Sequence, residues 1–174
     1  MSIPNMLSIF RLILIPVFAI VFFSPIEHAM LYSSIVFVIS GVTDLLDGYI
    51  ARKYNQVTKL GIVLDPLADK LTLLVVLFCL FKKELIPSWI LIFFVAKELS
   101  MILGGIFAYT RSDLVIPSNI FGKLATIFFY FSIFVLLFDK TIGIYLVYAT
   151  VISAVIALFS YIKIFWNNKH SFKK

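Results

Sequence analysis

Residues 44–69 read DLLDGYIARKYNQVTKLGIVLDPLAD, and this stretch joins two long apolar segments of the chain. The two segments, at 29–52 and 61–81, are long enough to cross a bilayer, which takes about 20 apolar residues per helix. A charge at the centre of a membrane-spanning helix costs at least about 2.5–3.5 kcal/mol on insertion scales. The acids of this stretch therefore need partners that offset this cost.

The composition of the whole chain is that of a membrane protein. Of its 174 residues, 62% are hydrophobic and 14% are charged, whereas soluble domains have about 25% charged residues. Cys79 is the single cysteine, so neither a disulfide framework nor a cysteine zinc site is expected. We predict an all-α integral membrane protein that forms one domain over residues 1–174. Its six transmembrane helices are predicted at 6–24, 29–52, 61–81, 87–109, 119–138 and 142–166.

The net charge of +6 follows from membrane topology. The basic residues lie mostly at the ends of spans, whereas a nucleic-acid binder needs a continuous basic face, so we expect no nucleic-acid partner. If the N-terminus is cytoplasmic, the opposite side holds only Lys82, Lys83 and Lys140. The cytoplasmic side then holds Arg11, Arg52, Lys53, Lys59, Arg111, Lys163, Lys169, Lys173 and Lys174. The positive-inside rule predicts a multi-pass protein of the cell membrane with both termini in the cytoplasm.

Four carboxylates lie in the second and third predicted spans. Asp44 and Asp47 are three residues apart, and Asp65 and Asp69 are four apart, so each pair shares one helix face. Because the connection between these spans is short, we expect them to pack as antiparallel neighbours with their acidic faces together near the cytoplasmic surface. Ligation by oxygen alone suits hard divalent cations. Two such ions would balance four negative charges.

These acids also have structural explanations. Asp65 precedes Pro66, which is typical of a helix N-cap followed by proline in the first turn. Asp47 could pair with Arg52. Small residues accompany the acids, and Gly48 is one of them; such residues favour close helix packing in membranes, and they also leave room for a ligand.

The spacing of the quoted stretch, D-x2-D-G-x2-A-R-x8-G-x3-D-x3-D, resembles the signature of the CDP-alcohol phosphotransferase family. All eight fixed positions match, namely Asp44, Asp47, Gly48, Ala51, Arg52, Gly61, Asp65 and Asp69. The resemblance implies six membrane helices with a metal site at the cytoplasmic ends of the second and third. It also implies a transferase of phospholipid biosynthesis, in which the hydroxyl of an acceptor alcohol displaces CMP from a donor such as CDP-diacylglycerol.

The resemblance also implies roles for single residues. Two divalent cations, Mg²⁺ or Mn²⁺, would be held by Asp44, Asp47, Asp65 and Asp69, with Asp69 also the catalytic base toward the acceptor hydroxyl. The cytidine diphosphate part would contact Gly48, Ala51 and Arg52. A forked guanidinium matches a phosphate group well. Family members are often homodimers, although no dimer face can be identified in the sequence.

The acceptor is less strongly specified than the reaction. The segment IPNMLSIFRLILIPVF, residues 3–18, resembles the bacterial phosphatidylglycerophosphate synthase branch of the family, which implies glycerol 3-phosphate as the acceptor. Lys97, Arg111 and Lys123 are the cations available to an acceptor phosphate. Lys97 and Glu98 could form a buried ion pair or a helix-packing pair, but because neighbours on a helix do not face each other, they are expected to have different partners. Cardiolipin synthases, which use phosphatidylglycerol, share much of the stretch, and that alternative stays open.

A divalent-cation transporter is the alternative from another class. Transporter sites usually lie near the bilayer midplane between related repeats. Here the acids cluster toward the ends of two consecutive spans, and no internal repeat is evident. A purely structural scaffold gives no reason for four acids at one depth. Release of CMP that depends on divalent cations would separate an enzyme from both.

Overall fold

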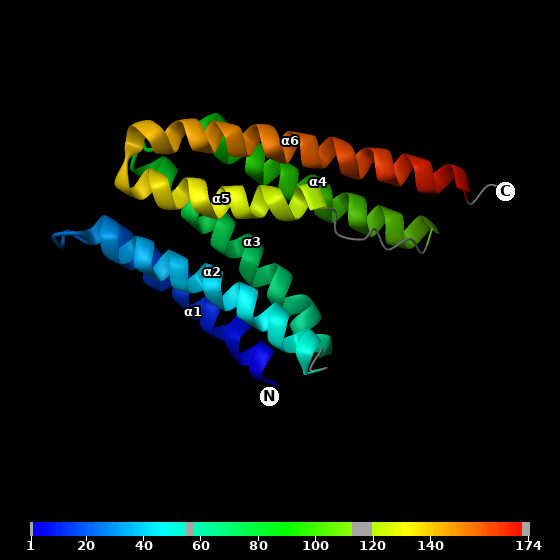
Figure 1. The fold of residues 1–174 in the computed structure, drawn as a ribbon, viewed down its shortest axis with the longest axis horizontal. Coiled ribbons are helices and arrows are strands. Elements are labelled where there is room, and N and C mark those ends of the chain that lie inside the picture. The colour runs from blue at the N-terminus through cyan, green and yellow to red at the C-terminus, as the bar shows by residue number, and fades with distance from the viewer. Residues whose placement is uncertain (1, 55–57, 113–119, 172–174) are drawn as a thin grey trace. The chain divides into compact units, whose positions relative to one another are not determined.

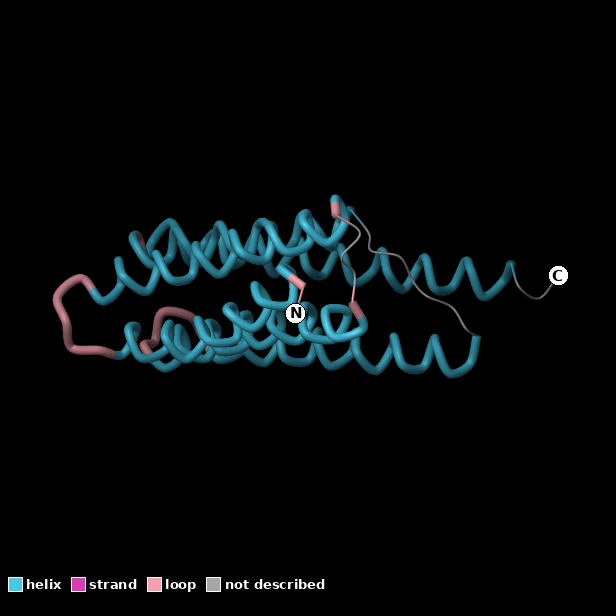
Figure 2. Tube along the Cα trace, turned by 90° about the horizontal axis from the view of Figure 1, so that it is seen from below, coloured by secondary structure: helices cyan, strands magenta, loops and turns pink. Residues whose placement is uncertain are grey.

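The computed structural model describes residues 2–54, 58–112 and 120–171, and it contains six helices in those ranges (Figure 1). In Figure 2 the described residues form helices joined by loops. Side chains are not described at 52, 59–60, 62, 104–112, 120–123 and 160–171. The helices are α1 Ile3–Phe23, α2 Ala29–Lys53, α3 Lys59–Lys82, α4 Ser88–Ser112, α5 Ile120–Phe138 and α6 Lys140–Ser171. Each corresponds to one predicted span, so the all-α prediction with six helices is confirmed.

Three stretches of helix in the described residues are long and apolar enough to cross a membrane, at Ile3–Phe23, Ala29–Ala51 and Lys140–Phe159. A shorter apolar stretch runs from Leu124 to Phe138. Helix α3 carries Asp65, Asp69 and Lys70 in its first half, and these charges lower the hydropathy of that half. The chain is a membrane protein, and the full count of six spans stays a prediction.

The chain divides into two compact units, Met1–Leu91 and Ile92–Lys174. In the first unit, α1 packs along both α2 and α3. Its core contains the rings of Phe18 and Phe22, stacked 5.4 Å apart, and the ring of Phe37, 6.2 Å from that of Phe18. Direct packing of α2 on α3 is not prominent among the described residues, so the expected direct pairing of the second and third spans is wrong. The reason lies in α1, whose polar side chains contact the acids of both helices.

Helix α3 begins earlier than the position of Asp65 and Pro66 suggested. Thr58 is its N-cap, and the Thr58 hydroxyl accepts a hydrogen bond of 2.9 Å from the backbone N–H of Gly61. Pro66 therefore lies inside the helix, where membrane helices tolerate proline. The interpretation of Asp65 as an N-cap is wrong, which leaves its carboxylate available for contacts with other helices.

The second unit contains a tight hairpin of α5 and α6. Asp139 caps α6 by accepting hydrogen bonds from the backbone N–H groups of Thr141 and Ile142, at 2.8 and 3.0 Å. Gly143 lies so close to α5 that a Cβ atom there would be 2.2 Å from the Cα atom of Leu136. Small residues allow such close approach between membrane helices. Deeper in the hairpin, the hydroxyl groups of Thr150 and Ser132 lie 3.1 Å apart.

Candidate functional site

Buried polar side chains gather at one end of the first unit. They come from the first half of α1, the second half of α2 and the beginning of α3, which meet at that end. We call this group the polar layer. It consists of Asn5, Ser8, Arg11, Asp44, Asp47, Thr58 and Asp65. Its α1 members recur every three residues, so they share the face of α1 that is turned toward its neighbours.

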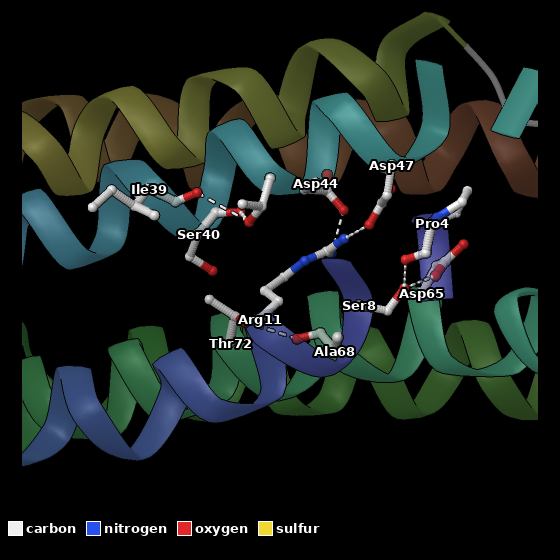
Figure 3. Close-up of polar contacts among 11 residues, drawn as sticks. Pro4, Ser8, Arg11, Ile39, Ser40, Asp44, Asp47, Asp65, Ala68 and Thr72 are labelled. Carbon is white, nitrogen blue, oxygen red and sulfur yellow. Dashed lines mark hydrogen bonds and ion pairs between the residues drawn. The ribbon is translucent and has the colours of Figure 1, made fainter. Parts of the chain in front are cut away.

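Arg11 is the centre of the polar layer, and its side chain is fully buried. One terminal nitrogen, Nη1, donates to Oδ1 of Asp44, and the other, Nη2, donates to Oδ2 of Asp47 (Figure 3). Asp47 is 2% exposed, whereas the side chain of Asp44 is 30% exposed. A buried charge is tolerable only with a close partner of opposite sign. Arg11 therefore ties α1 to the acidic face of α2.

A second set of contacts ties α1 to the beginning of α3. The Thr58 hydroxyl donates a hydrogen bond of 2.7 Å to Oδ1 of Asn5. The Ser8 hydroxyl contacts Oδ1 of Asp65 (Figure 3). A Cβ atom on Gly61 would lie 3.0 Å from the Asn5 amide oxygen and 3.7 Å from Oδ2 of Asp65. The absent side chain of Gly61 is therefore part of how Asn5 and Asp65 come together.

The remaining motif residues lie close by on the same helices. Asp69 is half-buried on α3, one turn after Asp65. Gly48 and Ala51 are half-buried on α2, within about one turn of Asp47. The side chain of Arg52 lies outside the described residues. The residues predicted to contact cytidine diphosphate thus adjoin the predicted metal ligands along the chain.

The four motif aspartates come from two helices, two from α2 and two from α3, and side chains of α1 contact acids of both helices. No group of three or more acids, histidines and cysteines is close enough to hold a metal ion in the part of the chain that the structure describes. The donors nonetheless fit a hard cation chemically, because all are carboxylate oxygens. Two of them already hold a buried cationic group, Arg11, so this location accepts positive charge. The metal site itself stays a prediction.

The three cations predicted for the acceptor phosphate belong to the second unit. Lys97 and Glu98 form an ion pair, with Nζ 2.5 Å from Oε1. The alternative of a buried ion pair is confirmed, and the expectation of different partners is wrong. The flexible lysine side chain reaches the adjacent carboxylate, and both groups are largely buried. The side chains of Arg111 and Lys123 lie outside the described residues. Their predicted role, like that of Lys97, stays a prediction.

Sequence reasoning missed the contribution of the first helix. It treated Arg11 as a surface charge of the cytoplasmic side, whereas the side chain is buried and ion-paired. Asn5 and Ser8 were not considered, although they are buried as well. The signal was available, because three polar residues at intervals of three in an apolar span form one polar stripe. Without Arg11, eight of the assigned basic residues remain on the predicted cytoplasmic side and three on the opposite side, so the predicted orientation is unchanged.

Comparisons with known proteins agree with the motif. A family model described as CDP-alcohol phosphatidyltransferase matches residues 1–161. A protein of Wigglesworthia glossinidia brevipalpis is 34% identical over 97% of both chains. A protein of Aquifex aeolicus is 38% identical over 74% of this chain and 71% of its own length, and one of Bacillus subtilis is 34% identical over 72% and 70%. All three relatives are named CDP-diacylglycerol–glycerol-3-phosphate 3-phosphatidyltransferase.

Proposed function

Because the chain belongs to the CDP-alcohol phosphatidyltransferase family, we propose that it transfers a phosphatidyl group from CDP-diacylglycerol to glycerol 3-phosphate and releases CMP. One observation carries this proposal. The relative from Wigglesworthia glossinidia brevipalpis, which is named for that reaction, matches 97% of this chain. The eight motif residues and the polar layer at one end of the first unit support the same reaction.

The motif acids form the proposed metal site. Asp44, Asp47, Asp65 and Asp69 would hold two divalent cations, Mg²⁺ or Mn²⁺. When bound, these ions would neutralise the diphosphate of the donor and stabilise the charge of the departing CMP. The half-buried position of Asp69 suits a carboxylate that accepts the proton of the acceptor hydroxyl. Asp69 is therefore the proposed general base.

The donor would be recognised by α2. Gly48 and Ala51 have small side chains next to the acids, and they leave space for the cytidine diphosphate group. Arg52, at the end of α2, would donate to its phosphate oxygens through a forked guanidinium. The acyl chains of the donor would stay in the bilayer while its head group reaches this end of the helices.

The acceptor carries a phosphate and needs cations. Lys97, Arg111 and Lys123 are the proposed contacts. In the structure Lys97 is held by Glu98, so an acceptor phosphate would have to share or replace that partner. Lys97 would therefore favour an anionic acceptor, because a neutral acceptor such as inositol could not replace the charge of Glu98. We place six spans in the cell membrane, with both termini and the site on the cytoplasmic side, as the basic residues indicate.

An acceptor panel tests the proposal. The purified protein in detergent would receive CDP-diacylglycerol, Mg²⁺ or Mn²⁺, and one of four acceptors: glycerol 3-phosphate, phosphatidylglycerol, inositol phosphate or serine. We expect CMP and the phosphatidyl product with glycerol 3-phosphate alone. Asp69→Asn should lower the rate by about 10²-fold or more, since the amide cannot accept the proton. Product with phosphatidylglycerol would instead assign the acceptor of cardiolipin synthesis, and no CMP with any acceptor would contradict the enzyme.

A further inference from the structure

The ion pairs of Arg11 use carboxylate oxygens that a divalent cation would also need. Arg11 reaches Oδ1 of Asp44 with one nitrogen and Oδ2 of Asp47 with the other, so a single guanidinium bridges both acids of α2 (Figure 3). The bridge joins residues that lie 33 and 36 positions apart in the chain. It therefore fixes the acidic face of α2 against α1.

The charge balance of this bridge is incomplete. Two carboxylates and one guanidinium leave one net negative charge in a largely buried place, so the site still attracts cations. The third nitrogen of the side chain, Nε of Arg11, has no hydrogen-bond partner within the described residues. The guanidinium is thus held chiefly through the two acids, and not by a complete set of hydrogen bonds of its own. A guanidinium held in this way can be replaced at the two acids by another cation.

A guanidinium and a divalent cation cannot both use the same lone pairs fully. A guanidinium is a permanent cation, so it yields its place only by moving. A divalent cation that binds the α2 acids must push the guanidinium aside or share the carboxylates with it, at a cost in affinity. Without any divalent cation, Arg11 limits the repulsion between two neighbouring acids inside the helix bundle.

We propose that Arg11 is a positioning residue that holds Asp44 and Asp47 in place when no divalent cation is bound, and that it competes with the first such cation for their oxygens. This proposal rests on the metal site of the proposed function. Arg11 stabilises the metal-free protein and sets how much divalent cation is needed to fill the site. A merely structural arginine would affect stability without changing the affinity for metal.

Mn²⁺ binding measured directly tests this inference without reference to activity. Free Mn²⁺ would be followed by electron paramagnetic resonance during titration of the full-length protein in detergent, for wild type, Arg11→Gln and Arg11→Lys. Removal of the competing charge should tighten Mn²⁺ binding by about fivefold or more, at the low end of usual coupling between two binding events. Arg11→Lys keeps the charge but loses the fork that spans both acids, so its affinity should lie between the other two.

Thermal unfolding of the same proteins gives the second readout. In EDTA, Arg11→Gln should unfold at a lower temperature than wild type, and saturating Mn²⁺ should raise its midpoint by more than it raises that of wild type. Lys53→Gln is the matched control, because Lys53 is an exposed cation at the same end of α2 that lies over the rings of Tyr49 and Tyr54. It should change neither quantity.

Each result shows whether Arg11 competes with the metal ion or assists its binding. Equal or weaker Mn²⁺ binding in Arg11→Gln would overturn the inference, since Arg11 would then assist the metal or act on the fold alone. If Arg11→Gln does not fold, Arg11→Lys decides by the same measure. Wild type that binds no Mn²⁺ would overturn the inference together with the proposed metal site. Wild type that binds Mn²⁺ and releases no CMP would contradict the proposed reaction only.

Discussion

The two units of this protein solve the problem of helix packing in a membrane differently. In the first unit, α1 contacts α2 and α3 through buried charges and amides, with Arg11 paired to Asp44 and Asp47. In the second, the hairpin of α5 and α6 relies on close approach at Gly143 and on hydroxyl groups at Thr150 and Ser132. Buried charges cost more than close apolar packing. The first unit bears this cost where the proposed chemistry needs acids.

Loss of an acid from the first unit should have the largest effect on stability. Asp47→Ala leaves the fully buried Arg11 with only the partly exposed Asp44 as partner. Removing one partner of a buried ion pair typically costs about 3–5 kcal/mol. We expect a loss of that order in the free energy of unfolding, measured in detergent with EDTA present so that no metal contributes.

The control for this variant is Glu27→Ala, which removes an acid whose side chain is 90% exposed. It should leave the free energy of unfolding nearly unchanged. If both variants lose the same small amount, the ion pair of Arg11 and Asp47 does not stabilise the first unit, and the contrast between the units fails.

A methyl group on Gly143 should destabilise the second unit by overpacking the hairpin. Its Cβ atom would come within 2.2 Å of Cα and 2.6 Å of the backbone nitrogen of Leu136, which cannot move as a side chain can. Overpacking typically costs about 1–3 kcal/mol. Gly143→Ala should lower the thermal midpoint accordingly, whereas Ile142→Ala, at an exposed position of the same turn, should lower it much less.

The Gly143→Ala variant also tests whether a change in the hairpin alters metal binding in the first unit. Because Gly143 belongs to the hairpin and not to the polar layer, the Mn²⁺ affinity of folded Gly143→Ala should equal that of wild type. A changed affinity would mean that the two units do not act separately in this respect.

Removal of a single hydroxyl from the hairpin should have the smallest effect. Thr150→Val keeps the shape of the side chain and removes its contact with the Ser132 hydroxyl at 3.1 Å. Hydrogen bonds between membrane helices contribute about 0.6 kcal/mol on average. A double-mutant cycle with Ser132→Ala should give a coupling energy of about that size. A coupling near zero would show that the two hydroxyl groups do not stabilise the hairpin through contact with each other.

The sequence predicts the helices well because each is a long apolar run with polar ends. The same patterns say little about which helices touch. A short connection suggested direct pairing of the second and third spans, but the partners of their acids stand on α1, 33 to 57 residues away in the chain. Mean hydropathy does not reveal such partners, whereas the spacing of Asn5, Ser8 and Arg11 marks a polar stripe on α1 that could have predicted them.

The sequence predicted the four aspartates of the candidate site. It did not predict the side chains of α1 that contact them. Fixed spacing revealed Asp44, Asp47, Asp65 and Asp69, since the pattern of eight positions is long and specific. The N-cap interpretation of Asp65 failed because Thr58 caps α3 earlier. The ion pair of Lys97 and Glu98 was one of two alternatives that the sequence left open, because adjacency rules describe backbone directions and not the reach of a long side chain.

Divalent dependence of CMP release tests whether the motif aspartates hold a metal that the transfer reaction needs. The protein would be stripped with EDTA, supplied with CDP-diacylglycerol and glycerol 3-phosphate, and then titrated with Mn²⁺ or Mg²⁺ while CMP is measured. We expect no CMP without a divalent cation, full release on its return, and in Asp69→Asn a rate about 10²-fold or more below that of wild type at every metal concentration. Release that continues in EDTA, or a wild-type rate in Asp69→Asn, would contradict a transferase built on these aspartates.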